Sequence, residues 1–500
     1  MPKVAAKTKD VVQKYVREFS SETFKGDGGV LYCVCCDKPV STTTRFLVMQ
    51  HINTAKHKEN KERRKSRFQQ TFITQTTTSA VSGKSGFDID LCRALVRADI
   101  PFHKVSHPEF KCFLEKYTGK TIPHETTLRK SHLDVIYNET LDKIRDFIKN
   151  GPIWVSMDET TDVEGRYIVN VIVGKLSTDS PSKPFLLNCE VLDKCNHATI
   201  ARYFNDCMSL LWPSGVQHEN VLLFLSDGAP YMVKAGAAIQ VFYPKLLHLT
   251  CLAHAFHRVA ETVRFQFPDI DQLIATVKKV FLKAPSRVEI FKTNYPALPL
   301  PPQPVITRWG TWLKAGEYYC KNFNQITDVL SKLPSDSSAV EKAKSLIENP
   351  TLKQNLAYLY SNAVFLADKI TALETQNMPL ADSIAVVNSV IQKMDDAQGE
   401  NGSKMKKKFM DVLQKNPGWK DIQLIADILC GKTVEVVRDE LGVELDPTDI
   451  GVFKYAPVTA VDVERSFSRY KSILRPNRRS FLFENLKKLV VCNCNSSVDQ

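Results

Sequence analysis

The sequence has no apolar run long enough to cross a membrane, because no stretch approaches the roughly 18 consecutive apolar residues of a transmembrane helix. Its first residues, MPKVAAKTKD, also lack the apolar core of a secretory signal peptide. Both absences argue against a membrane or secreted protein. We therefore expect an intracellular, soluble chain without a membrane partner.

The sequence also lacks the pattern of a disulfide framework. It has 13 cysteines, an odd number, and most stand singly in apolar segments, as Cys92, Cys112, Cys207 and Cys430 do. This usage predicts reduced, buried thiols. With 500 residues, of which 43% are hydrophobic, the chain is expected to form several globular domains.

Positive charge is concentrated near the N-terminus. The chain has a formal net charge of +12, and residues 1–70 hold 15 Lys or Arg against 7 Asp or Glu. A basic segment of this kind matches a phosphate backbone, although it could equally be a solvated tail.

The spacing of potential metal ligands favours binding to a phosphate backbone over a solvated tail. Cys33-x2-Cys36 is followed, after fourteen residues, by His51-x5-His57. Two thiolates and two imidazoles can surround a tetrahedral Zn²⁺, so the spacing predicts a structural zinc site close to the C2H2 type. The alternative is a chance grouping of cysteines and histidines.

The local pattern predicts how this site is built. We expect one helix over about residues 44–56 that turns Phe46, Met49 and both histidines towards the metal. Cys35 lies between the two ligand cysteines and should point the other way, as a spare thiol.

A basic run follows the zinc spacing. Its cations can contact phosphates or act as a nuclear localisation signal, and the sequence does not separate these roles; they are Lys58, Lys61, Arg63, Arg64, Lys65 and Arg67. Residues 69–86 are polar, rich in Ser and Thr and uncharged before Lys84, which predicts a linker.

Residues 87–148 predict three or four short helices. Leu91, Leu95 and Ala98 follow a helical period, another helix follows Pro108, and a third begins after Pro123. This unit could be a spacer, but its position makes DNA binding or dimerisation plausible.

Residues 149–251 change to a strand pattern. Three β-branched runs separated by polar turns predict an antiparallel meander, and a helix, a strand, a helix and a final strand follow. This order is the one expected of a ribonuclease-H-like fold. The whole chain is thus predicted to be a multidomain α+β protein.

Two carboxylates are predicted to lie at one edge of that sheet. Asp158 should close the first strand and Asp227 the fourth, and these strands are neighbours in such a fold. Two close carboxylates repel each other unless a divalent cation lies between them. Alternatively, Asp227 serves the Ser226-Asp227-Gly228 turn and Asp158 caps a turn. Glu159 and Asp162 are expected to be turn and surface residues.

A third carboxylate lies far along the chain. Glu464 should project from a helix that ends before Pro476. Alternatively, Glu464 is a surface residue that forms an ion pair with Arg465 or Lys471.

Five segments resemble the hobo/Activator/Tam3 (hAT) superfamily of DNA transposases: MDETTD, LSDGAPYM, CLAHAFHRV, TRWGTW and VERSFSRYKSILRPNRRSF. They occur in the family's order across about residues 87–495. The first 130 residues also resemble the CGG triplet-repeat-binding family, through GGVLYCVCCD, HINTAKHK and ADIPFHKVSHPEFKCFL.

The resemblance implies a ribonuclease-H-like α/β core that is interrupted by a large all-α insertion. It identifies Asp158, Asp227 and Glu464 as an Asp-Asp-Glu triad for Mg²⁺ or Mn²⁺, and Cys251 and His254 as the family's Cys-x2-His. Arg308 and Trp309 match its Arg-Trp pair, in which an aromatic ring stacks on an unpaired base. Trp312 is a second candidate, and core packing is the alternative for either tryptophan.

The predicted domains are a zinc-finger module, a linker, a helical DNA-binding or dimerisation region, the first part of the catalytic core, the helical insertion and the last core helices; their residues are 1–68, 69–86, 87–148, 149–251, 252–455 and 456–495. In the last of these, an apolar helical stripe predicts at least a dimer; it comprises Phe481, Phe483, Leu486, Leu489 and Val490.

The predicted function is metal-dependent DNA cleavage and strand transfer by a nuclear hAT-type transposase that binds transposon ends and target DNA. The alternative is a domesticated, non-catalytic, sequence-specific DNA-binding regulator. A metal-dependent nuclease without strand transfer is a weaker third possibility.

Overall fold

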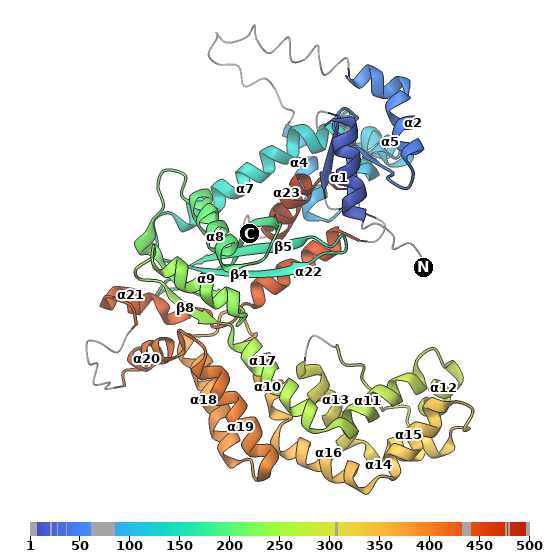
Figure 1. The fold of residues 1–500 in the computed structure, drawn as a ribbon, viewed down its shortest axis with the longest axis vertical. Coiled ribbons are helices and arrows are strands. Elements are labelled where there is room, and N and C mark those ends of the chain that lie inside the picture. Colours follow the sequence, from blue (N-terminus) through green and yellow to red (C-terminus); the bar gives the residue numbers. More distant parts are fainter. Residues whose placement is uncertain are drawn as a thin grey trace.

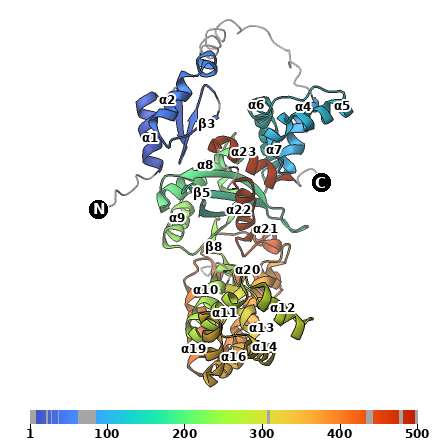
Figure 2. The ribbon, with the colours of Figure 1, turned by 90° about the vertical axis from the view of Figure 1, so that its right-hand side faces the viewer.

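The computed structural model describes residues 8–20, 23–27, 29–36, 38–61, 86–305, 309–432, 442–475, 478 and 481–496. Figures 1 and 2 show three levels. A small N-terminal module and a helical region lie at one end, a mixed sheet lies in the middle, and a large group of helices forms the other end. Within the described ranges, none of the helices combines the length and apolar character needed to cross a bilayer.

The N-terminal module packs helices on a small antiparallel sheet in the order β1-β2-β3. Its elements are α1 (Thr8–Phe19), β1 (Phe24–Asp27), β2 (Val30–Cys33), β3 (Lys38–Val40), α2 (Arg45–Asn53) and a helical segment over residues 55–61. Val12, Phe24, Leu31 and Val48 are fully buried and form its core. The module therefore has a hydrophobic core of its own, beside the candidate zinc ligands.

The helical region confirms the helices predicted after residue 86. It contains α4 (Gly86–Arg97), η1 (Phe102–Ser106), α5 (Pro108–Thr118), α6 (Glu125–Thr127), η2 (Leu128–His132) and α7 (Leu133–Ile148). The apolar positions of α4 and α7 pack together around Leu95, Leu133 and Ile136. Helix α5 buries none of its residues.

The central sheet has five strands in the order β6-β5-β4-β7-β8. The strands are β4 (Ile153–Thr161), β5 (Tyr167–Lys175), β6 (Phe185–Leu192), β7 (Val221–Ser226) and β8 (Leu247–Thr250). The predicted antiparallel meander β4-β5-β6 is confirmed, and β7 and β8 continue the sheet in parallel with β4.

Both faces of this sheet are covered by helices, as its continuous apolar runs require. One face, with Ile153, Val155 and Met157, packs on α7, α8 (His197–Leu211) and α9 (Pro230–Gln240). The opposite face, with Trp154, packs on α10 (Leu252–Gln266), α22 (Val461–Ile473) and α23 (Phe483–Cys494). The short helix η3 (His218–Asn220) leads into β7.

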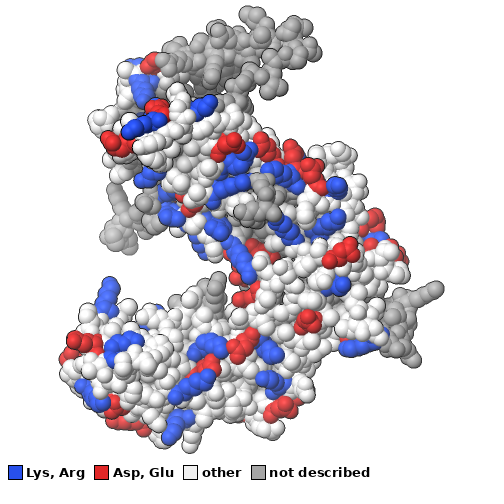
Figure 3. Space-filling model, turned by 180° about the vertical axis from the view of Figure 1, so that it is seen from behind, with Lys and Arg blue, Asp and Glu red and all other residues white. Residues whose placement is uncertain are grey.

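The described secondary-structure elements between α10 and α22 are all helices, as the sequence predicts. They are α11 (Pro268–Phe281), α12 (Pro285–Asn294), α13 (Trp309–Lys321), α14 (Phe323–Lys332), α15 (Ser338–Glu348), α16 (Pro350–Asn362), α17 (Phe365–Leu373), α18 (Leu380–Asp396), α19 (Gly399–Gln414), α20 (Trp419–Leu429), α21 (Pro447–Val452) and η4 (Phe453–Tyr455). From behind, Figure 3 shows a hollow between these helices and the middle of the molecule, with Lys and Arg gathered on the middle part.

The prediction of reduced, buried thiols is wrong in part. All 13 cysteines are free thiols, but Cys112 and Cys430 are exposed rather than buried. The apolar stripe of α23, which predicted a dimer, is covered by the chain itself: Phe483, Leu486 and Val490 are buried against the rest of the core. This stripe therefore gives no support to a dimer.

Candidate functional site

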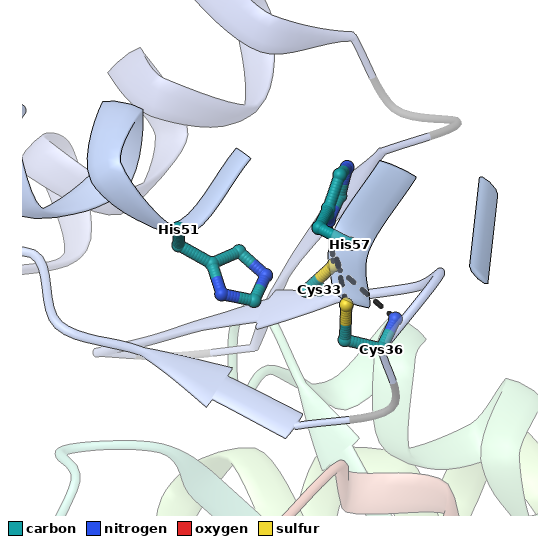
Figure 4. Close-up of side chains that lie close together, drawn as sticks. All are labelled: Cys33, Cys36, His51 and His57. Atoms are coloured by element: carbon teal, nitrogen blue, oxygen red, sulfur yellow. Dashed lines mark hydrogen bonds between the residues drawn. The ribbon is translucent and has the colours of Figure 1, made fainter. Parts of the chain in front are cut away.

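The four predicted zinc ligands converge in the N-terminal module. One ligand atom from each of Cys33, Cys36, His51 and His57 lies within 4.8 Å of all the others. His57 Nδ1 is 3.4 Å from both Cys33 Sγ and Cys36 Sγ. Ligands of a tetrahedral Zn²⁺ are about 3.5 Å apart, given Zn–S and Zn–N bonds of about 2.3 and 2.0 Å. Figure 4 shows the side chains arriving from β2, the turn after it and two helical segments.

A break in the helix explains how the long His-x5-His spacing works. Helix α2 ends at Asn53, and Thr54 has an extended backbone with ψ of 142° before the segment 55–61 begins. In a continuous helix, the side chains of residues six apart point in directions about 120° apart. The predicted single helix over residues 44–56 is therefore wrong, and the break turns His57 back towards His51.

The polar atoms of this group suit a metal ion. His51 Nε2 and His57 Nε2 are buried without a hydrogen-bond partner. The Cys36 N–H and the Asn60 amide donate to the two sulfurs, at 3.4 and 3.6 Å. Burial raises the pKa of Cys33 to about 12 and lowers the pKa of His51 to about 4. Without a cation the thiol keeps its proton, whereas a bound metal stabilises the thiolate, and the imidazole is already neutral, as a ligand must be.

The surroundings of the group differ from the sequence expectation at one residue. Phe46 is 72% exposed, so it does not face the metal ligands. Cys35 lies outside the group of four, as predicted. In the basic run, Lys58 and Lys61 are exposed on the segment 55–61. The other predicted phosphate contacts lie outside the described residues; they are Arg63, Arg64, Lys65 and Arg67.

The second candidate site begins with two carboxylates on neighbouring strands. In the parallel pair β4–β7, Val155 lies opposite Phe224 and Ser156 opposite Leu225. The strand β7 ends at Ser226, so Asp227 follows it directly, and its carboxylate is near enough to Asp158 to raise the pKa of that group. The strand β4 continues to Thr161, so Asp158 lies within the strand and neither ends it nor caps a turn, contrary to both readings of the sequence.

Glu464 approaches this sheet edge on α22. Its Oε1 is 3.4 Å from His254 Nε2, whereas Arg465 pairs instead with Asp462 at 2.9 Å. His254 lies in the first turn of α10, which begins directly after Cys251. The Cys251 sulfur accepts a hydrogen bond of 3.2 Å from the N–H of Ala460, which precedes α22. Cys251 and His254 thus join the end of β8 to the start of the helix that bears Glu464.

The charges at this edge influence one another. The pKa of Asp158 is raised to about 7, mainly by burial and also by the nearby carboxylates of Asp227 and Glu464, against the lowering effect of His254. The pKa of His254 is raised to about 10 by Cys251, Glu464 and Asp158, against the effect of burial. Among the described residues, only the Cys/His group brings three or more ligand atoms within 4.8 Å, so the three carboxylates are spread more widely than that.

Asp227 also has the turn role that the sequence offered as an alternative. Its Oδ1 accepts a hydrogen bond of 3.1 Å from the Ala229 N–H. The Ser226 hydroxyl donates to the Asp227 carbonyl oxygen at 2.8 Å and lies 2.9 Å from Nε2 of the buried His248. A rigid set of hydrogen bonds therefore fixes the backbone at Asp227.

Glu159 and Asp162 were expected to be turn and surface residues; Asp162 does lie in the turn after β4, but the surface position is wrong for both. Glu159 belongs to β4, its Oε2 is buried, and burial raises its pKa to about 7. The side chain of Asp162 is only 1% exposed and pairs with Arg166, Nε to Oδ2, at 2.7 Å. The sequence signal for this pair is faint: an acidic and a basic residue flank a Gly-containing turn.

The candidate base-stacking residues are resolved only in part. Arg308 and the side chain of Trp309 lie outside the described residues, although Trp309 begins α13. Trp312 is 2% exposed and its indole N–H donates to Asp271 at 3.0 Å. Trp312 is therefore a core residue, as its alternative interpretation states.

Comparisons with known proteins match two parts of the chain. Residues 123–282 match the family described as a domain of unknown function (DUF659), and residues 7–63 match the CGGBP1 N-terminal domain. The chain is 27% identical over 126 residues to CGG triplet repeat-binding protein 1 of both Mus musculus and Homo sapiens. The similarity covers 24% of this chain and 75% of each relative. One match thus contains the candidate zinc ligands, and another contains Asp158, Asp227, Cys251 and His254.

Proposed function

We propose that the chain is a hAT-type DNA transposase, or a protein derived from one, whose ribonuclease-H-like core cleaves and transfers DNA strands with Mg²⁺ or Mn²⁺. The observation that carries this proposal is the parallel pairing of β4 and β7, in which Asp158 of β4 and Asp227, directly after β7, lie towards the same end of two neighbouring strands. The strand order β6-β5-β4-β7-β8 and the electrostatic coupling of Glu464 to Asp158 support it.

The residues of this site fit a hard divalent cation. Carboxylate oxygens are the ligands that Mg²⁺ and Mn²⁺ prefer, and the raised pKa of Asp158 reports buried negative charge without sufficient compensation. In the proposed reaction, Asp158, Asp227 and Glu464 hold the cation while His254 holds the Glu464 carboxylate. The bound metal would activate the attacking hydroxyl and stabilise the leaving 3′ oxygen.

The N-terminal module is proposed to hold structural Zn²⁺ and to bind double-stranded DNA in the nucleus. Its similarity to a relative named for binding CGG triplet repeats supports this role. Lys58 and Lys61, exposed beside the zinc group, are proposed phosphate contacts, together with the cations that follow them. The six domains, the base contact by Arg308 and Trp309 and the dimer remain part of the proposal.

A second candidate function is a DNA-binding regulator without cleavage activity. The match to the CGGBP1 N-terminal domain favours it, because this match covers residues 7–63 and ends before the sheet. In this case the carboxylates at the sheet edge are retained but unused.

The experiment that separates the two functions is Mg²⁺-dependent nicking at candidate transposon ends by the wild-type protein and by Asp227→Asn. The substitution keeps the side chain's shape and its acceptor to Ala229 but removes a charge that the cation needs. We expect cleavage to be lost, DNA binding to persist, and stability to hold or rise slightly because carboxylate repulsion is relieved.

Asp206→Asn, at an exposed position of α8, is the matched control and should cleave normally. Full cleavage by Asp227→Asn would refute the proposed triad. Absence of cleavage by the wild-type protein, with intact binding to DNA, would favour the regulator.

A further inference from the structure

The turn between β4 and β5 is built around the carboxylate of Asp162. Its Oδ1 accepts hydrogen bonds of 2.9 Å from the backbone N–H groups of Glu164 and Arg166. Its Oδ2 accepts from Arg166 Nε at 2.7 Å and from the Tyr470 hydroxyl at 2.9 Å. Every contact of this carboxylate is therefore local to the turn except that of Tyr470, which comes from α22.

This buried network joins three parts of the chain that are distant in sequence. Arg166 belongs to the hairpin, Tyr470 to α22, and the Arg166 guanidinium lies 5.6 Å from the centre of the Phe483 ring of α23. A buried ion pair is costly to desolvate, and apolar residues of similar volume often stabilise a core equally well. Its directional hydrogen bonds instead select one arrangement of the helix on the sheet.

A second contact fixes α22 one helical turn earlier. The Asn170 amide donates to Ser466 Oγ at 2.7 Å, and both residues are buried. Asn170 is the antiparallel partner of Asp158 in the β4–β5 register. Fixed points at Ser466 and Tyr470 set both the position and the rotation of α22 relative to the strand that carries Asp158.

Glu464 lies two residues before the first of these fixed points. Its Oε1 lies 3.4 Å from Nε2 of His254, which belongs to the first turn of α10, shortly after the end of β8. A small slide or rotation of α22 would move Glu464 along the sheet edge, whereas Asp158 is held by β4 and Asp227 by the hydrogen bonds of the turn after β7.

We propose that Asp162, through Arg166 and Tyr470, is a positioning residue that places Glu464 beside Asp158 and Asp227. This inference rests on the proposed function, in which Glu464 is a ligand of the divalent cation. The acidic segment MDETTD then has two roles: Asp158 is a candidate ligand, and Asp162 holds the helix that brings the third one.

The test uses ferrous iron as a probe in the full-length protein, because Fe²⁺ with ascorbate and peroxide cuts the backbone close to the bound ion. The key variant is Tyr470→Phe, which keeps the buried ring and removes only the hydroxyl group. Cuts are mapped near residues 158, 227 and 464, and Mg²⁺ is titrated as a competitor. Tyr243→Phe is the matched control, since it removes another buried hydroxyl, bonded to Asn205 at 2.9 Å, between α9 and α8.

We expect the wild-type chain to be cut at all three places. Tyr470→Phe should lose the cut near residue 464 relative to the other two and should need about 10-fold more Mg²⁺ for competition. Asp162→Asn should do the same, and Tyr243→Phe should keep the wild-type pattern. A merely stabilising role would lower the melting temperature without changing the proportions of the cuts.

Two results would overturn the inference, and they have different consequences for the proposed metal site. Unchanged proportions in both Tyr470→Phe and Asp162→Asn would refute the positioning role while leaving the proposed metal site intact. Absence of cuts near residues 158 and 227 in the wild-type chain would refute the metal site and the positioning role together. Cuts near the Cys/His group would show in either case that the probe is active.

Discussion

The Cys33 thiol is fully buried beside a second sulfur and two imidazoles, a setting in which only a cation favours the thiolate. We predict that Cys33→Ser abolishes zinc binding and lowers the stability of the N-terminal module. Metal analysis of the full chain should fall from one zinc to none. Cys35→Ser is the matched control and should retain the metal, because Cys35 lies outside the group. Retention of zinc by Cys33→Ser would contradict this ligand set.

His248 should make the stability of the sheet depend on pH. It is 2% exposed, and burial lowers its pKa from 6.5 to about 4. Between these pH values the unfolded chain binds a proton that the folded chain does not, so stability falls as the pH drops from 6.5 towards 4. The loss should reach about 3 kcal/mol of unfolding free energy.

Chemical denaturation of wild-type protein and His248→Gln across this pH range checks the prediction. Glutamine keeps an N–H donor for Ser226 but does not titrate, so the variant should have the flatter profile. His103→Gln, at an exposed position, should follow the wild type. Parallel profiles for wild type and His248→Gln would contradict the assignment.

At the scale of elements, the break between α2 and the segment 55–61 depends on one hydroxyl. Thr54 Oγ1 donates to the His51 carbonyl oxygen at 2.8 Å and accepts from the His57 N–H at 3.2 Å. It therefore ends one helix and caps the next. Thr54→Ala should weaken zinc binding by about 1 kcal/mol, or roughly five-fold, by removing both bonds.

A chelator competition titration measures this effect, and Thr54→Ser provides the control because serine keeps the hydroxyl. Its zinc affinity should stay close to that of the wild type. Equal affinities for the alanine and serine variants would show that the break is set by the metal ligands themselves.

The strands and the metal group could be predicted because each depends on a residue pattern within a short stretch of sequence. The β-branched apolar runs identified the strands, and the spacing of Cys33, Cys36, His51 and His57 identified the metal group. The break at Thr54 was missed because its side-chain bonds compete with helix propagation at a position where the periodicity is still helical. The clue in the sequence was the separation of six residues between His51 and His57, which is longer than one turn of a helix.

Contacts between distant segments could not be predicted in the same way. Asp162 is polar and follows a strand, so its sequence reads as a surface turn; its partner Tyr470 lies 308 residues away. The same limit explains α23, whose apolar stripe indicates burial but does not say which surface covers it. Asp158 and Asp227 could be related across the sheet only because the order of strands already predicted their neighbours.

For the whole molecule, α23 joins the helical region of residues 86–148 to the central sheet. It packs on the sheet and on the helical region, where the Asn493 amide donates to the Val96 carbonyl oxygen at 2.9 Å. The Asn495 amide donates to the Leu186 carbonyl oxygen of β6 at 2.8 Å. The helix therefore holds the helical region against the sheet.

This arrangement predicts that α23 governs stability rather than association. Leu486 is fully buried in the core shared with the sheet, so Leu486→Ala leaves a cavity and should cost about 2–5 kcal/mol of unfolding free energy. Glu484→Ala, exposed on the same helix, should have little effect. On the same samples, thermal unfolding measures stability and light scattering measures mass. The mass should be the same for the wild type, Leu486→Ala and Glu484→Ala. A lower mass for Leu486→Ala with an unchanged melting temperature would instead show that α23 is an interface between copies of the chain, and would restore the apolar stripe as the reason to expect a dimer.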